Sequence, residues 1–144
     1  MLYEVSVATQ TGDAKTFKKY AAQHNLKFYD LLVEELLKNP KVKEQLSRAN
    51  VTNADSFIDF SFRSIAQRMS ATPRTKIEAF AREYAAAPLT FTSDTEAKAE
   101  AKAGMLKVVR EADMWKVDST EVLKKALLAS LPLTAESKAK LEKF

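Results

Sequence analysis

The sequence has no cysteine and only two glycines among its 144 residues. Without cysteine, the chain cannot form disulfide bonds, thiolate zinc sites or a cysteine nucleophile. Gly12 and Gly104 are too few to build a glycine-rich phosphate loop, and they disfavour a turn-rich all-β fold. These absences favour a helical fold whose function does not depend on thiol chemistry.

Histidine is almost as scarce, because His24 is the single one in the chain. One imidazole cannot make a histidine-rich zinc site, and no Ser/His/Asp or Cys/His set can be assembled around it. We interpret His24 as a surface or helix-capping residue.

Asp59 is a candidate for acid–base chemistry, because it lies among large apolar residues, where burial would raise its pKa. An ion pair with Arg63, four residues later, explains the position of Asp59 equally well. We therefore expect a protein that is not an enzyme and needs no cofactor or metal.

Long apolar runs and a signal-peptide pattern are also missing, so we expect a cytoplasmic protein that does not enter a membrane. The hydrophobic fraction of 46% and charged fraction of 29% are those of an ordinary globular domain. The length fits one domain over residues 1–144, and the nearest candidate for a subdivision lies at 88–93.

Residues 2–8, LYEVSVA, alternate between two faces, with Tyr3, Val5 and Val7 on one of them. A period of two with β-branched and aromatic residues predicts a half-buried strand. The segment LTFT at 89–92 is the other strand candidate. Four arrangements are open for the first strand: pairing with LTFT, pairing with a dimer mate, addition to a partner's sheet, or an extended arm on the helices.

The rest of the chain predicts about seven to eight helices, so we expect an all-α single compact bundle with one short N-terminal strand. Apolar spacing, proline positions and capping residues set the expected boundaries. The longest expected helix starts at a Ser-Asp-Thr-Glu capping box and includes the alanine-rich stretch EAKAEAKAG. The expected helices span about 13–24, 28–38, 40–48, 54–69, 73–87, 94–116, 118–131 and 134–144.

The segment VSVATQTGDAKTFKKYAAQHNLKFYDLLVEELL resembles a ribbon-helix-helix DNA-binding unit in its order of strand, helix, turn and helix. The resemblance covers residues 3–38. It implies a dimer whose paired strands read the major groove. Here the outward positions hold Glu4, Ser6 and Ala8, and Lys27-Phe28 replaces the Ser or Thr that usually precedes the second helix of that family.

The formal net charge of +4 is spread thinly, but residues 63–76 contain four basic residues and no acid. Side chains there and a helix N-terminus could surround a phosphate group. A nucleic-acid-binding protein is thus the second hypothesis. Its expected contacts are Lys18, Lys19, Lys27, Arg63, Arg68, Arg74 and Lys76.

Our first hypothesis is a non-enzymatic protein that binds a protein partner through a helical surface, as an inhibitor, adaptor or assembly subunit. Most aromatic residues fall at helical spacing and are expected in the core. Four are expected to reach a partner, because they lie near an end of the chain, at a helix end or beside the predicted strand: Tyr3, Phe28, Trp115 and Phe144. A homodimer is an open alternative.

Overall fold

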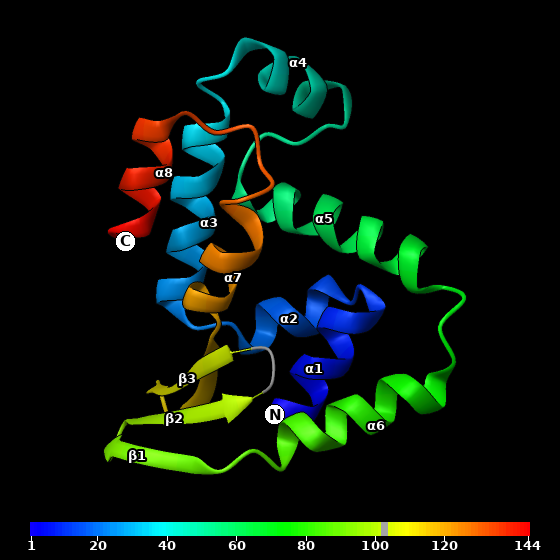
Figure 1. Ribbon diagram of the computed structural model, residues 1–144, viewed down its shortest axis with the longest axis vertical. Helices are drawn as coiled ribbons and strands as arrows, with labels where there is room; N and C mark the ends of the chain where they lie inside the picture. The colour runs from blue at the N-terminus through cyan, green and yellow to red at the C-terminus, as the bar shows by residue number, and fades with distance from the viewer. Residues whose placement is uncertain (102–103) are drawn as a thin grey trace.

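The computed structural model describes residues 1–101 and 104–144, and within them the chain forms eight helices and a four-stranded antiparallel sheet (Figure 1). The expected all-α bundle with one strand is therefore wrong. The elements in chain order are α1 Leu2–Thr11, α2 Ala14–Tyr20, α3 Gln23–Leu36, α4 Pro40–Arg48, α5 Ala54–Met69, α6 Arg74–Ala85, β1 Leu89–Ser93, β2 Glu96–Ala101, β3 Gly104–Glu111, β4 Met114–Asp118, α7 Thr120–Leu127 and α8 Ala135–Glu142.

The predicted N-terminal strand is instead the helix α1. Its buried residues include Leu2, Val5 and Ala8, which are three apart and so lie along one side of a helix. Gly12 ends the helix with a φ of 78°, and its N–H donates to the carbonyl of Ala8. This left-handed cap needs glycine. A ribbon for DNA reading or for pairing with LTFT is therefore absent.

Among the next helices, α2 ends earlier than expected, whereas α4 and α5 have the expected boundaries. Asp13 accepts a hydrogen bond from the backbone of Thr16 and starts α2. That helix ends at Tyr20 rather than near His24, because Ala21 and Ala22 are extended and the former bridges to β4. The helices α4 and α5 have the predicted boundaries, 40–48 and 54–69.

The predicted helix over 94–116 is wrong, because this segment forms β2, β3 and most of β4; residues 102 and 103 lie outside the described residues. In EAKAEA the alternation has a structural meaning: Ala97 and Ala99 are buried while Lys98 is exposed. The predicted strand LTFT is confirmed as β1, and its register places Leu89 and Phe91 opposite Ala99 and Ala97.

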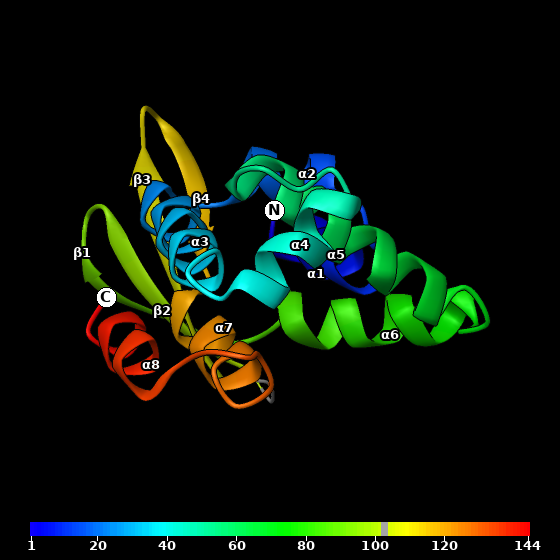
Figure 2. The same ribbon diagram turned by 90° about the horizontal axis from the view of Figure 1, so that it is seen from above.

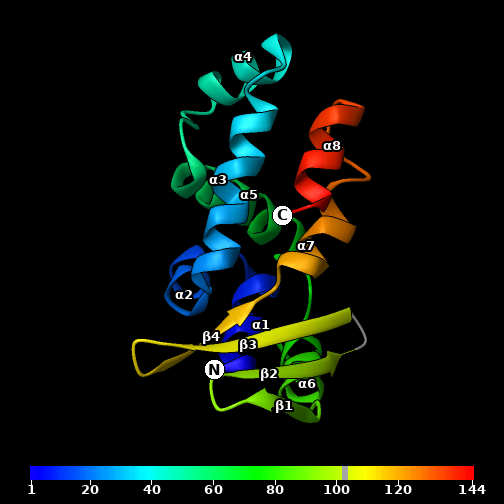
Figure 3. The same ribbon diagram turned by 90° about the vertical axis from the view of Figure 1, so that its left-hand side faces the viewer.

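The sheet has the strand order β1-β2-β3-β4, and one of its faces is covered by α1 and α6 (Figure 3). A small apolar core joins the start of α1 and Tyr84 of α6 to this face. A larger core lies among α2, α3, α4, α5, α7 and α8. Figure 2 shows α3 and α7 on one side of the molecule and α6 on the other, with α1 between them.

Candidate functional site

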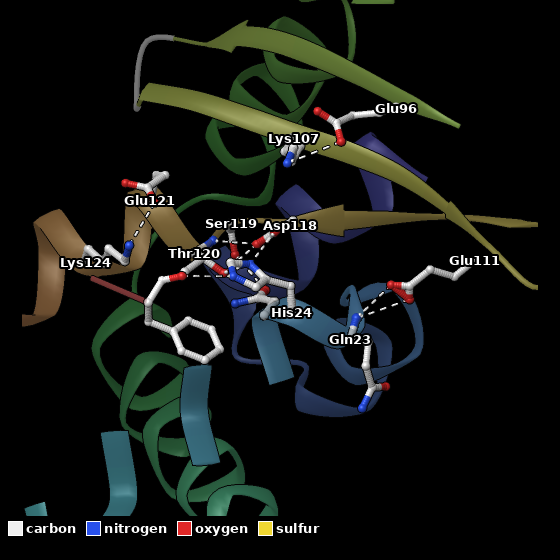
Figure 4. Close-up of polar contacts among 12 residues, drawn as sticks. Gln23, His24, Glu96, Lys107, Glu111, Asp118, Ser119, Thr120, Glu121 and Lys124 are labelled. Atoms are coloured by element: carbon white, nitrogen blue, oxygen red, sulfur yellow. Dashed lines mark hydrogen bonds and ion pairs between the residues drawn. The ribbon is translucent and has the colours of Figure 1, made fainter. Parts of the chain in front are cut away.

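The polar face of the sheet ends at a cluster built around His24 and Asp118 (Figure 4). His24 is the second residue of α3, and Asp118 is the last residue of β4. The Nδ1 atom of His24 lies 2.8 Å from Oδ2 of Asp118. The other carboxylate oxygen of Asp118 accepts from the backbone N–H and the hydroxyl of Thr120, the first residue of α7. Asp118 therefore caps α7 and holds His24 at the same time.

The second nitrogen of His24 is also occupied. Its Nε2 atom lies 3.3 Å from the backbone oxygen of Phe144, and the two rings are stacked with centroids 4.7 Å apart. The prediction that His24 ends a helix near Asn25 is wrong, since it lies in the first turn of α3. The cluster joins α3, β4, α7 and the end of the chain.

Two further contacts fix the same junction. The carboxylate of Glu111, at the end of β3, accepts from the backbone N–H of Gln23 and so caps the N-terminus of α3. The hydroxyl of Ser119 donates to Oδ1 of Asn25, which is fully buried. The start of α3 is thereby attached to two strands and to α7.

A histidine with a carboxylate partner can act as a general base only when its other nitrogen reaches a substrate proton. Here that nitrogen faces the backbone of Phe144. The hydroxyl of Thr120 donates to Asp118 and lies 3.3 Å from Nδ1 of His24, but that nitrogen is closer to the carboxylate of Asp118, at 2.8 Å. These contacts suit a structural junction better than acid–base chemistry.

A pocket of about 260 Å³ adjoins this cluster. It contains Lys98 and Lys107, which lie directly opposite each other on β2 and β3. The ammonium group of Lys107 pairs with Glu96, and the pocket also contains Asp118 and Glu121. The charges are mixed, so the pocket offers no clear preference for an anion or a cation. Within residues 1–101 and 104–144, no group of three or more acidic or histidine side chains is arranged to hold a metal ion.

The basic residues expected to contact nucleic acid lie on α2, α3, α5 and α6. Lys18 is held by both Asp55 and Asp59 of α5, at 2.8 and 2.7 Å. Asp59 therefore pairs with Lys18, whereas Arg63 contacts only its backbone oxygen. Burial lowers the pKa of Lys18, but its hydrogen bonds with the two carboxylates outweigh this and raise it overall.

Among the other basic residues, Arg74 pairs with Glu78, and the ammonium group of Lys19 lies over the ring of Tyr20. Lys27, Arg63, Arg68 and Lys76 are exposed. Lys27 is on α3, while the turn between α5 and α6 lies at the opposite side of the molecule (Figures 1 and 2). The basic residues therefore do not gather into one stripe.

The four expected partner contacts also separate. Phe28 is fully buried, so it cannot meet a partner at the surface. Phe144 packs against His24 and Phe28, and Tyr3 is half-buried on α1. Trp115 lies on β4, where its ring makes an edge-to-face contact with Phe91 at 6.2 Å.

Phe91 belongs to a surface that we call the β1 edge, formed by residues 89–93 of β1. All five residues are exposed, and the side chain of Phe91 retains 64% of its accessible surface. An apolar groove of about 240 Å³ runs beside the edge, lined by Met1, Leu2, Leu89, Phe91, Ala97, Val108 and Trp115. Trp115 was expected to contact a partner, but Leu89 and Phe91 were not. The signal that could have found them is an uncharged strand, LTFTS.

The two edges of the sheet differ. The β4 edge is covered, because Ala21 bridges to Val117 and the N–H of Ala22 donates to the Val117 carbonyl at 2.9 Å. The β1 edge pairs only with β2 in the part of the chain that the structure describes. It therefore presents free backbone donors and acceptors along one side.

Comparison with known proteins finds no matching family, no matching curated sequence and no matching solved structure. Among the described residues, no helix has the length and apolar character needed to cross a membrane. The functional conclusion therefore depends on the geometry of the chain itself.

Proposed function

We propose that the protein is a non-enzymatic binding protein that takes up an extended segment of a protein partner along the β1 edge. The observation that carries the proposal is this edge, free on one side and lying beside an apolar groove. A peptide that adds a strand gains affinity from main-chain hydrogen bonds and specificity from alternate side chains. This differs from the helical binding surface expected from the sequence.

The composition of the edge supports this choice. Proteins usually protect a free edge with charged residues, with proline or with bulges. Residues 89–93 contain no charge. The register shift after Phe91 interrupts the pairing with β2 there, so the regular part of the edge is Leu89, Thr90 and Phe91. The alternate side chains Leu89 and Phe91 lie on the side of the groove. We therefore expect a partner segment with apolar residues at every second position, and we place this interaction in the cytoplasm.

Selection from a library of random twelve-residue peptides displayed on phage tests the proposal. The selection should enrich peptides in which apolar and polar residues alternate. Phe91→Lys should weaken the binding of these peptides at least tenfold. Met105→Lys is the matched control. Met105 retains 44% of its surface, as Leu89 does, but lies on β3 away from the groove.

Three outcomes would contradict the proposal. One is a failure to enrich any peptide, and another is equal binding to the wild type and the Phe91→Lys variant. The third is a stable dimer at micromolar concentration that Phe91→Lys converts to monomer, because the edge would then serve a second copy of the chain instead of a partner.

A further inference from the structure

A cavity of about 370 Å³ lies between the two apolar cores. Its walls come from α1, α2, α3, α5, α6, the strands β3 and β4, and α7. The cavity reaches the surface, because Thr9, Phe80 and Ala126 are exposed and also line it. It is distinct from the groove at the β1 edge, with which it shares no lining residue.

The lining of this cavity is mainly apolar. Val5, Phe17, Phe62, Leu106 and Val117 contribute to it and are almost completely buried. No charged side chain lines the cavity among the residues whose placement is described. A volume of this size lies within the range of small-molecule sites, and an apolar molecule that enters it would remove the apolar walls from water. Such a lining favours a neutral apolar occupant over water.

Tyr29 supplies a second, independent observation. The residue is only 4% exposed and lines the cavity, yet its hydroxyl has no hydrogen-bond partner within residues 1–101 and 104–144. Burial raises the pKa of this hydroxyl, so it stays a protonated donor. Among the described residues, Nδ2 of Asn25 is the one fully enclosed polar side-chain atom without a partner, so the Tyr29 hydroxyl keeps some accessible surface and can donate to a molecule in the cavity.

Tyr84 and Ser119 extend the polar part of the lining, to which Ser6, Thr9 and Gln10 of α1 also belong. Burial raises the pKa of Tyr84 to about 12, and its hydroxyl likewise has no partner among the described residues. The hydroxyl of Ser119 donates to Asn25, which leaves the Ser119 oxygen free to accept. The cavity therefore combines an apolar body with a few uncharged polar groups.

We propose that this cavity binds a neutral, mainly apolar small molecule whose oxygen atom accepts a hydrogen bond from Tyr29. Aromatic or aliphatic alcohols, ketones and esters belong to this class. The apolar walls bind the body of the molecule, and the hydroxyl of Tyr29 selects for the oxygen. Charged analogues such as carboxylates are disfavoured, because the described part of the lining has no basic side chain to pair with them.

Two probes that differ by one hydroxyl test this inference: naphthalene and 2-naphthol, titrated into the full chain and followed by fluorescence. We expect saturable binding at one site, with 2-naphthol binding about threefold to tenfold more tightly, the range of one neutral hydrogen bond. In Tyr29→Phe this preference should disappear while naphthalene affinity stays the same. In Ala126→Trp the indole should fill the opening and weaken both probes at least tenfold.

Ala129→Trp is the matched control for the second variant, because Ala129 is also exposed near the end of α7 but does not line the cavity. It should leave both affinities unchanged, and circular dichroism should show native helix content in all three variants. The inference is overturned if neither probe saturates, or if Ala126→Trp binds as the wild type does. It is also overturned if 2-naphthol remains preferred in Tyr29→Phe.

Discussion

Glu35 provides the sharpest quantitative prediction, because its carboxylate is buried at the contact between α3 and α8. The side chain is 2% exposed and accepts hydrogen bonds from Lys38 and Lys140. It also accepts a hydrogen bond of 2.7 Å from the buried hydroxyl of Ser137. The hydrogen bonds from Lys38, Ser137 and Lys140 lower the pKa of Glu35 from 4.5 to about 2.

This difference in pKa corresponds to a stability contribution. A tenfold change in proton affinity is worth about 1.4 kcal/mol, so the interval from 4.5 to about 2 corresponds to about 3.5 kcal/mol at most. Both lysines are at least half-exposed, and solvent screening reduces their share. We therefore expect Glu35→Gln to lower the free energy of unfolding by about 1 to 2 kcal/mol at pH 7.

The stability contribution of Glu35 should depend on pH in one direction. Because the folded pKa of Glu35 is lowered, its contribution is complete above pH 4.5 and is lost as the pH falls toward 2. Urea unfolding at pH 7, 4.5, 3 and 2 should show the difference between wild type and Glu35→Gln shrinking in that interval. The exposed neighbour Glu34 is the control, and Glu34→Gln should change stability by less than about 0.5 kcal/mol. Equal stability of the wild type and Glu35→Gln at pH 7, or a difference independent of pH, would refute the reasoning.

Three further predictions follow from single contacts. Gly12→Ala should lower the melting temperature by several degrees, since its new Cβ would clash with the carbonyl oxygen of Phe62 at a φ of 78°; an unchanged melting temperature would contradict this. Asp118→Ala should cost about 1 to 2 kcal/mol in urea unfolding, because it removes the cap of α7 and the partner of His24, and a change below about 0.5 kcal/mol would show that the junction adds little. Fluorescence anisotropy with a 20-base-pair duplex at low salt should show no saturable binding; binding that falls steeply with salt would instead support the nucleic-acid hypothesis.

Helices with strong local signals could be predicted from the sequence. The helix over 54–69 starts at Asn53, whose side chain accepts from the backbone of Ser56. The helix over 40–48 starts with Pro40 after Asn39, which caps Lys41. In both cases the signals lie within one turn, so they do not depend on the rest of the fold.

The helix propensity of alanine predicts a helix where the structure has the sheet. Alanine is the strongest helix former, but in EAKAEA it occupies every second position, which is the period of a strand. The turn between β3 and β4 could not be predicted from the sequence either. Its residues Ala112 and Asp113 adopt positive φ values of 46° and 63°, but neither is a glycine. Helix α1 shows the opposite case: LYEVSVA alternates and predicts a strand, but it folds as a helix that packs against α5 and α6.

The sites depend on residues that are far apart in the chain. His24 and Asp118 are 94 positions apart, so no local sequence motif indicates that they lie in contact. The cavity has no local signature either, because its lining comes from eight separate elements. Composition did exclude thiol chemistry, but it could not identify the polar junction, the groove or the cavity.

The difference between the two sheet edges connects the fold to the proposed function. An unpaired row of backbone groups is a liability, and the chain covers one such row by placing Ala21 and Ala22 against Val117. The same chain leaves the β1 edge open and puts exposed aromatic surface at Phe91 beside it. If protection were the only requirement, a single lysine at position 91 would supply it at little cost to stability, since the side chain is mostly exposed. We therefore expect Phe91→Lys to lower stability by no more than its contact with Trp115, about 1 kcal/mol, while partner binding is lost, which separates a binding role of this residue from a folding role.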